Sequence, residues 1–98
     1  MATFITTLKF TEKGLQSIHD SPKRANAFKA VVKRMGVKVA NIYWTFGSFD
    51  GVLIFNAPND ETATAAMLHL SSHGNVHTTT TRAFSSSEME KVLGLMGK

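Results

Sequence analysis

The segment 42–55, "IYWTFGSFDGVLIF", decides the fold because it predicts two apolar strands joined by a tight turn. A two-residue loop at Gly47-Ser48 would place Trp44 opposite Gly51 and Tyr43 opposite Val52. Side-chain alternation then divides the hairpin into two faces. The apolar face, which we expect under the helices, carries Ala40, Ile42, Trp44, Phe46, Phe49, Leu53 and Phe55. The other face mixes aliphatic and polar residues, namely Val39, Asn41, Tyr43, Thr45, Asp50, Val52 and Ile54.

The chain before the hairpin predicts one strand and a broken helix. Residues 2–10 alternate between apolar and polar side chains, which is typical of a strand. Thr11 is suited to cap the helix that follows, and Ser21 is suited to cap its second piece, with Pro22 in the first helical position. Gly36 is a natural stop for that helix.

The chain after the hairpin predicts a helix over residues 59–74, a threonine-rich strand and a last helix that opens on the capping box Ser85 and Glu88. The complete order is β-α-β-β-α-β-α. It predicts one α+β domain over residues 1–98, with a ferredoxin-like sandwich, a four-stranded antiparallel sheet and a C-terminal helix. The predicted core consists of Phe28, Val31, Met35, Trp44, Phe55, Met67 and Leu70.

The face of the hairpin that mixes aliphatic and polar residues predicts that another protein surface covers it. Val52 and Ile54, with Ile5 of the first strand, are unexpected on a face that meets water. A second copy related by a two-fold axis would cover them and close a barrel around an internal chamber. Asn41, Tyr43, Thr45 and Asp50 would line or rim that chamber.

Several segments together resemble a known family. "YWTFGSFDGVLIF", "DSPKRANAFKA", "PNDETATA" and "GNVHTTTTRAF" look like the GYD-domain family of small bacterial proteins, over essentially the whole chain. The family is named for a Gly-Tyr-Asp signature, whereas here Phe49 precedes Asp50. The resemblance implies a ferredoxin-like fold and a dimeric α/β barrel. It implies no agreed activity.

Composition restricts the class of protein. The absence of cysteine excludes disulfides, thiolate metal sites and thiol catalysis. The opening residues have no basic region of a signal peptide, and the longest apolar run, Gly51 to Phe55, is too short to span a membrane. We therefore expect a cytoplasmic protein. The net charge of +4 lies largely on the predicted helix before Gly36, opposite its apolar stripe. We interpret it as a solvated face and expect no nucleic-acid partner.

The polar residues of the hairpin permit two interpretations. Asp50 is a candidate general base or ligand anchor, or it serves the turn by accepting backbone hydrogen bonds. Asn41 and Tyr43 would hold a substrate, or they would satisfy one another at an interface. Arg82 would neutralise an anionic ligand, pair with Asp50, or form a salt bridge at the rim. The ligand-binding candidates are therefore Asn41, Tyr43, Thr45, Asp50 and Arg82, with no residue assigned to catalysis.

Metal and cofactor signals are weak. His69 and His73 have the i, i+4 spacing of helical metal ligands, but no third ligand is near in sequence, and the helical pattern turns His69 away from the inner side. We therefore expect no metal and no cofactor.

Two functions are compatible with these features. The first is a homodimer, or a larger assembly of the same chain, that binds an unknown small molecule between or beside the facing sheets. The second is a cofactor-independent oxygenase or isomerase acting on a small aromatic or polyketide-like substrate, with Asn41 and Tyr43 as candidates.

Overall fold

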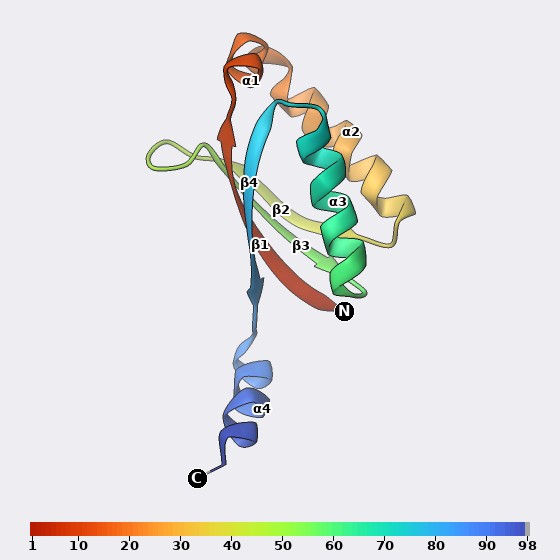
Figure 1. Cartoon of the computed structure of the whole chain (residues 1–98), viewed down its shortest axis with the longest axis vertical. Coiled ribbons are helices and arrows are strands. Elements are labelled where there is room, and N and C mark those ends of the chain that lie inside the picture. The colour runs from red at the N-terminus through yellow and green to blue at the C-terminus, as the bar shows by residue number, and fades with distance from the viewer. Residues whose placement is uncertain (98) are drawn as a thin grey trace.

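The computed structural model describes residues 1–97 and contains one sheet with two long helices on one of its faces (Figure 1). The strands are β1 (Ala2–Phe10), β2 (Lys38–Trp44), β3 (Gly51–Ala57) and β4 (Val76–Ala83). The helices are α1 (Glu12–Gln16), the 3-10 turn η1 (Ile18–Asp20), α2 (Ser21–Arg34), α3 (Asp60–Ser72) and α4 (Ser86–Met96). All neighbouring strands are antiparallel, in the order β2-β3-β1-β4. The predicted α+β ferredoxin-like topology is confirmed. None of the helices described within residues 1–97 is long and apolar enough to cross a membrane.

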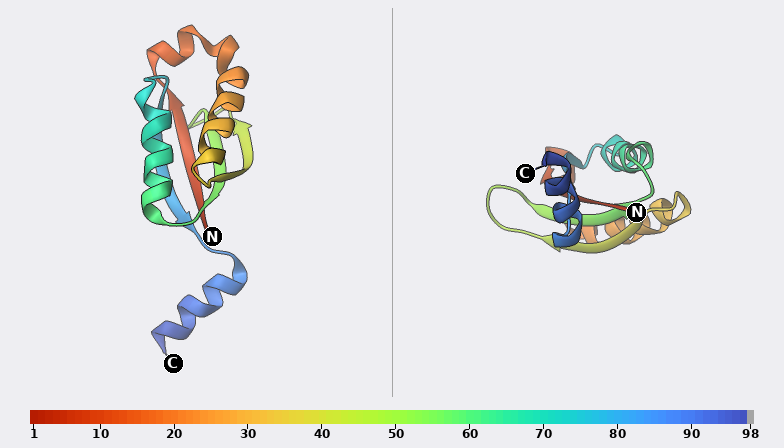
Figure 2. Two further views of the ribbon diagram at one scale, coloured as in Figure 1. Left: turned by 90° about the vertical axis from the view of Figure 1, so that its right-hand side faces the viewer. Right: turned by 90° about the horizontal axis from the view of Figure 1, so that it is seen from below.

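The core lies between the sheet and the helices α2 and α3, which run side by side over the same face (Figure 2). Phe55 and Leu53 of β3 are fully buried, and the Phe55 ring stacks on Phe4 of β1 at a centroid distance of 5.3 Å. Val32 contributes from α2 and Met67 from α3. Of the predicted core, Phe28, Phe55 and Met67 are buried, whereas Val31, Met35 and Leu70 are half-buried.

The termini of α1 and α2 follow from local residue chemistry. Thr11 caps α1, because its side chain accepts a hydrogen bond from the Gly14 N–H at 3.1 Å. Gly14 itself lies against Asn75, whose carbonyl would collide with any Cβ at this position. Ser21 is not the cap of α2 as the sequence suggested. Asp20 occupies the N-cap, and Ser21 lies inside the helix, where its hydroxyl accepts a hydrogen bond from the indole of Trp44.

The hairpin register is confirmed near the turn and shifted at its far end. Trp44 pairs with Gly51 and Tyr43 with Val52, as predicted. A bulge between Val39 and Asn41 then places Val39, rather than Ala40, opposite Phe55. Val39 therefore packs on the core and Ala40 is exposed, which reverses the faces predicted for these two residues.

Two aromatic residues of the hairpin are not in the core. Trp44 lies on the helix side but at the end of the edge strand β2, and 48% of its surface is exposed. Phe46 lies in the connection between β2 and β3, which projects away from α2 and α3, and it is fully exposed (Figure 1). Alternation correctly predicted the side of Trp44. Its predicted burial is wrong, because β2 is an edge strand and the first turn of α2, which contacts the indole through Ser21, leaves much of the ring uncovered.

The sheet face opposite α2 and α3 is open in the single chain. Its centre carries the aliphatic residues Ile5, Ile54 and Val52, with Ile5 opposite Ile54 and Thr7 opposite Val52. Thr79 and Thr81 extend this face on β4. Ile5 remains 38% exposed, although it lies on a central strand.

Helix α4 projects beyond the sheet, away from the other helices (Figure 1). The predicted capping box is present, with Ser85 Oγ accepting from the Glu88 N–H and Glu88 Oε1 accepting from the Ser85 N–H. No residue of α4 is buried. Its apolar residues Met89, Leu93, Leu95 and Met96 are exposed.

Candidate ligand-binding cleft

A cleft of about 300 Å³ lies between the sheet and the helices α2 and α3. Its sheet wall contains the apolar side chains Leu8, Phe10, Ile42, Leu53 and Val76. Its helix wall contains Ala25, Phe28, Val31 and Leu70. Polar residues also line the cleft, among them Ser21, Arg24, Asp50, His69, His73 and Asn75, and the rest of the lining is Ala27, Tyr43, Trp44 and Gly51. Predominantly apolar concave sites of this size, with a few polar groups, are typical of small-molecule sites.

The cleft exists because the two helices pack over different strands. Helix α2 contacts β2, whereas α3 contacts β3 and β4. Small residues add to the space between them, with Ala25 on α2 and Gly51 at the start of β3. A Cβ at Gly51 would lie 3.2 Å from the Leu8 side chain and 3.1 Å from the Tyr43 carbonyl, which is tighter than ordinary packing. The glycine therefore permits the close approach of the Leu8 side chain and the Tyr43 carbonyl at the floor of the cleft.

Trp44 and Ser21 connect the two walls at the edge of the cleft. The indole Nε1 of Trp44 donates to Ser21 Oγ at 3.0 Å. Ser21 is buried in the first turn of α2, so its hydroxyl is satisfied by a residue of the edge strand. The ring of Trp44, the one tryptophan of the chain, thereby lies against the opening.

Arg24 places a guanidinium beside the apolar lining. Its Nη1 donates to the Ser17 carbonyl at 2.8 Å and to Ser17 Oγ at 3.1 Å. The side chain is half-buried and forms no ion pair with any acid among residues 1–97. The remaining N–H groups of the guanidinium have no hydrogen-bond partner within this part of the chain.

Both His69 and His73 line the cleft, which corrects the expectation that His69 turns away. Their rings are edge to face with centroids 4.9 Å apart. His73 Nδ1 lies 2.9 Å from the His69 carbonyl, so the other nitrogen of His73 is directed away from the backbone. In residues 1–97, no three His, Asp or Glu side chains gather in a group that could hold a metal ion.

Asp50 joins the hairpin to β1. Its Oδ2 accepts a hydrogen bond from the Phe10 N–H at 2.8 Å, and its own N–H donates to the Leu8 carbonyl at 2.7 Å. Thr45 belongs to the same turn, because its hydroxyl donates to the Phe49 carbonyl and its N–H donates to the Asp50 carbonyl. Both predicted site residues therefore hold the turn, and Asp50 also borders the cleft.

Asn41 and Tyr43 lie together near the free edge of β2. Asn41 Nδ2 donates to the Tyr43 hydroxyl at 3.2 Å, and both side chains are exposed. Their register places them on the open sheet face with Ile54 and Val52, as predicted. Atoms of Tyr43 also contribute to the lining of the cleft.

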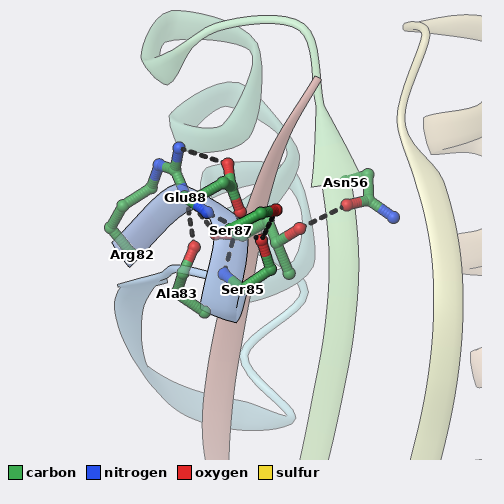
Figure 3. A network of polar contacts seen from close by, with 7 residues as sticks. Asn56, Arg82, Ala83, Ser85, Ser87 and Glu88 are labelled. Carbon is green, nitrogen blue, oxygen red and sulfur yellow. Dashed lines mark hydrogen bonds and ion pairs between the residues drawn. The ribbon is translucent and has the colours of Figure 1, made fainter. Parts of the chain in front are cut away.

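Arg82 lies apart from the other predicted site residues. It pairs with Phe4 near the start of β1, whereas Asp50 bonds to Phe10 at the end of that strand. Its guanidinium donates to the carbonyls of Thr3 and Ala83 and forms an ion pair with Glu88 at 3.7 Å (Figure 3). It also lies 4.4 Å from the centroid of the Phe84 ring. The suggested Asp50–Arg82 pair is therefore wrong. Arg82 instead holds the start of α4.

The carboxylate of Glu88 has a lowered pKa. The largest cause is the hydrogen bond from the Ser85 backbone N–H, followed by the hydrogen bond with the Ser85 side chain. Desolvation opposes these two effects, and the charge and hydrogen bond of Arg82 lower the pKa further by smaller amounts. Glu88 is therefore ionised at neutral pH, where it stabilises the first turn of α4.

Sequence reasoning missed the residues that line the cleft on the helix side. Ser21 was assigned to a cap and Arg24 to a solvated basic face, because a helical pattern does not show where two helices separate. The available signal was the small residue Ala25 among the bulkier residues of the helix wall.

The comparisons with known proteins agree with this fold. A family model described as the GYD domain matches residues 4–93. A protein of Thermus thermophilus, named "Glutamine synthetase and cystathionine beta-lyase binding protein", is 34% identical over 84 residues, which is 85% of this chain and 88% of the relative. The crystal structure of TTHA0845, also from Thermus thermophilus, superposes with a TM-score of 0.57 at 19% identity, over 88% of this chain and 96% of the other. At that identity the structural match supports the fold alone.

Proposed function

We propose that this chain, which belongs to the GYD-domain family, is a homodimeric protein that binds a small apolar molecule in the cleft between its sheet and the helices α2 and α3. The observation that carries the proposal is the cleft itself, whose apolar lining includes the buried side chains of Leu53 and Phe28. A small domain gains stability by closing such a space, so an open apolar cleft favours a ligand that fills it.

The cleft differs from the chamber expected from the sequence, because it lies on the opposite face of the sheet. The open face, with Ile5, Val52 and Ile54 at its centre, is assigned to a second copy of the chain. A two-fold contact would cover the aliphatic centre and bring the exposed Phe46 of the projecting turn toward the partner. The dimer and the ligand site therefore use separate faces.

Fluorescence titration with N-phenyl-1-naphthylamine, a neutral apolar probe, tests the binding proposal. Since Trp44 is the one tryptophan and borders the cleft, we expect energy transfer from Trp44 to the bound probe. The substitution Ala25→Leu adds a bulky side chain to the helix wall and should weaken binding by about tenfold or more.

Ala65→Leu is the matched control, because Ala65 is exposed on α3 and does not line the cleft. This variant should bind the probe as the unmodified chain does. Absence of saturable binding to the unmodified chain, or equal binding by Ala25→Leu, would contradict the proposal.

Binding of another protein is a second candidate function, favoured by the exposed apolar residues of α4. The Thermus thermophilus relative carries the name of a binding protein for glutamine synthetase and cystathionine β-lyase. We propose that α4 offers Leu93 and Met96 to a glutamine synthetase. Sedimentation of the chain with purified glutamine synthetase should show a complex that Leu93→Ser abolishes and that Glu90→Gln, on the same exposed helix, retains. If no complex forms, or if α4 proves to bind a second copy of the chain, this candidate is wrong.

A further inference from the structure

We propose that the cleft prefers an apolar molecule that carries an anionic group, with Arg24 as the partner of that group. The inference rests on the proposed function, because it specifies the chemistry of the ligand in the same site. It adds a preference for a negatively charged ligand, which an apolar lining alone would not provide.

Arg24 retains hydrogen-bond donors that the chain does not use. Both of its hydrogen bonds involve Nη1 and the single residue Ser17, so they fix the guanidinium while leaving its other N–H groups without partners among residues 1–97. A guanidinium presents donors in a planar fork that matches carboxylate, sulfonate or phosphate oxygens. A half-buried, positioned and unpaired guanidinium beside an apolar surface is therefore complementary to an amphiphilic anion.

The polar groups are divided unequally between the two walls. On the helix wall, His69 of α3 and His73, the C-cap residue of that helix, line the same cleft, and no acidic residue among residues 1–97 lines that wall. The acid in the lining is Asp50, on the sheet side, where its Oδ2 is bonded to the Phe10 N–H. Because Asp50 forms no ion pair with Arg24, it leaves the guanidinium available.

These positions predict an orientation for the ligand. The apolar body contacts Leu53, Ile42 and Phe28, and the anionic group lies toward the first turns of α2. Charge recognition of this kind contributes to specificity, since an anion without a partner would not enter an apolar cleft.

Two probes that differ by one anionic group test the inference. 1-Anilinonaphthalene-8-sulfonate has the ring system of N-phenyl-1-naphthylamine with an added sulfonate. We expect the unmodified chain to bind the sulfonate at least about tenfold more tightly, the factor that one charge-assisted hydrogen bond supplies. Arg24→Gln should remove that preference, so that the ratio of the two affinities falls to about one. Arg24→Lys should retain part of it.

Lys33→Gln is the control for net charge, because it removes one positive charge from an exposed position on the same helix. Its affinity for both probes should be unchanged, and circular dichroism should show that all variants remain folded. If both probes bind the cleft with equal affinity, or if Arg24→Gln and Lys33→Gln weaken the sulfonate equally, the inference is wrong although the binding function stands. If neither probe binds, the proposed function itself fails.

Discussion

The indole N–H of Trp44 donates a hydrogen bond of 3.0 Å to the hydroxyl of Ser21, and this contact joins the edge strand β2 to the first turn of α2. The contact lies at the edge of the cleft and holds the indole ring whose fluorescence would report ligand binding. Truncation of Trp44 should cost less stability than the truncation of a fully buried core residue. A fully buried aromatic residue contributes about 3–5 kcal/mol when truncated, but this one is 48% exposed.

Removal of this hydrogen bond should lower stability modestly. Ser21→Ala and Trp44→Phe should each reduce the free energy of unfolding by about 1 kcal/mol, the usual contribution of one hydrogen bond. The double variant should cost less than the sum of the two, because both changes remove the same contact. Urea denaturation followed by circular dichroism measures these values. Strict additivity would show that the contact does not contribute to stability.

Asp50 should tolerate an amide but not the loss of its acceptor. Asp50→Asn keeps a side-chain oxygen for the Phe10 N–H, whereas Asp50→Ala leaves that part-buried N–H without a partner. We expect Asp50→Ala to lower the free energy of unfolding by about 1–3 kcal/mol, with a smaller effect for Asp50→Asn. Thermal denaturation of the two variants distinguishes these effects. Equal destabilisation by both variants would mean that the charge of Asp50 is required.

The open sheet face should mediate the dimer. Ile54→Lys places a charge at its aliphatic centre and should produce a monomer, as measured by sedimentation velocity at micromolar concentration. Leu68→Lys is the control, because Leu68 is exposed on the outer side of α3. A stable monomer for the unmodified chain would contradict the assignment of this face.

Acidification should unfold the first turn of α4 before the sheet. The lowered pKa of Glu88 means that its contribution to stability is present at neutral pH, above its ordinary titration range. That contribution is lost as the pH falls through the lowered value, when the carboxylate gains a proton. The helical signal of Glu88→Gln should therefore depend less on pH than that of the unmodified chain. If the two pH profiles coincide, the capping interaction does not stabilise α4.

The sequence was sufficient for the topology because each element carries its own signal. Alternation in β1, the capping residues Thr11 and Ser85 and the positive φ of Gly36 are local features, and the structure has each of them. The bulge at Ala40 was not predictable, since alternation assumes that every residue of β2 has one partner on β3. The exposure of Trp44 depends on how far α2 extends over the sheet.

The candidate site was predicted only in part for a related reason. Asp50 borders the cleft, but Arg82 lies near the other end of β1, because register rather than residue type decides which end of a strand a side chain occupies. Arg24 and His69 gain their importance from a gap between two helices. The distance between two helices leaves no repeating pattern of residues in the sequence, so these two side chains could not be predicted as site residues.

The central claim is that a small apolar ligand binds between the sheet and the helices rather than on the open sheet face. Methyl-resolved nuclear magnetic resonance with N-phenyl-1-naphthylamine measures this most directly, because both surfaces carry methyl groups. We expect saturable shifts at Leu53, Val31 and Leu70 of the cleft, with little change at Ile5, Val52 and Ile54 of the open face. Shifts concentrated at Ile5, Val52 and Ile54, with Leu53 and Leu70 unchanged, would contradict the claim.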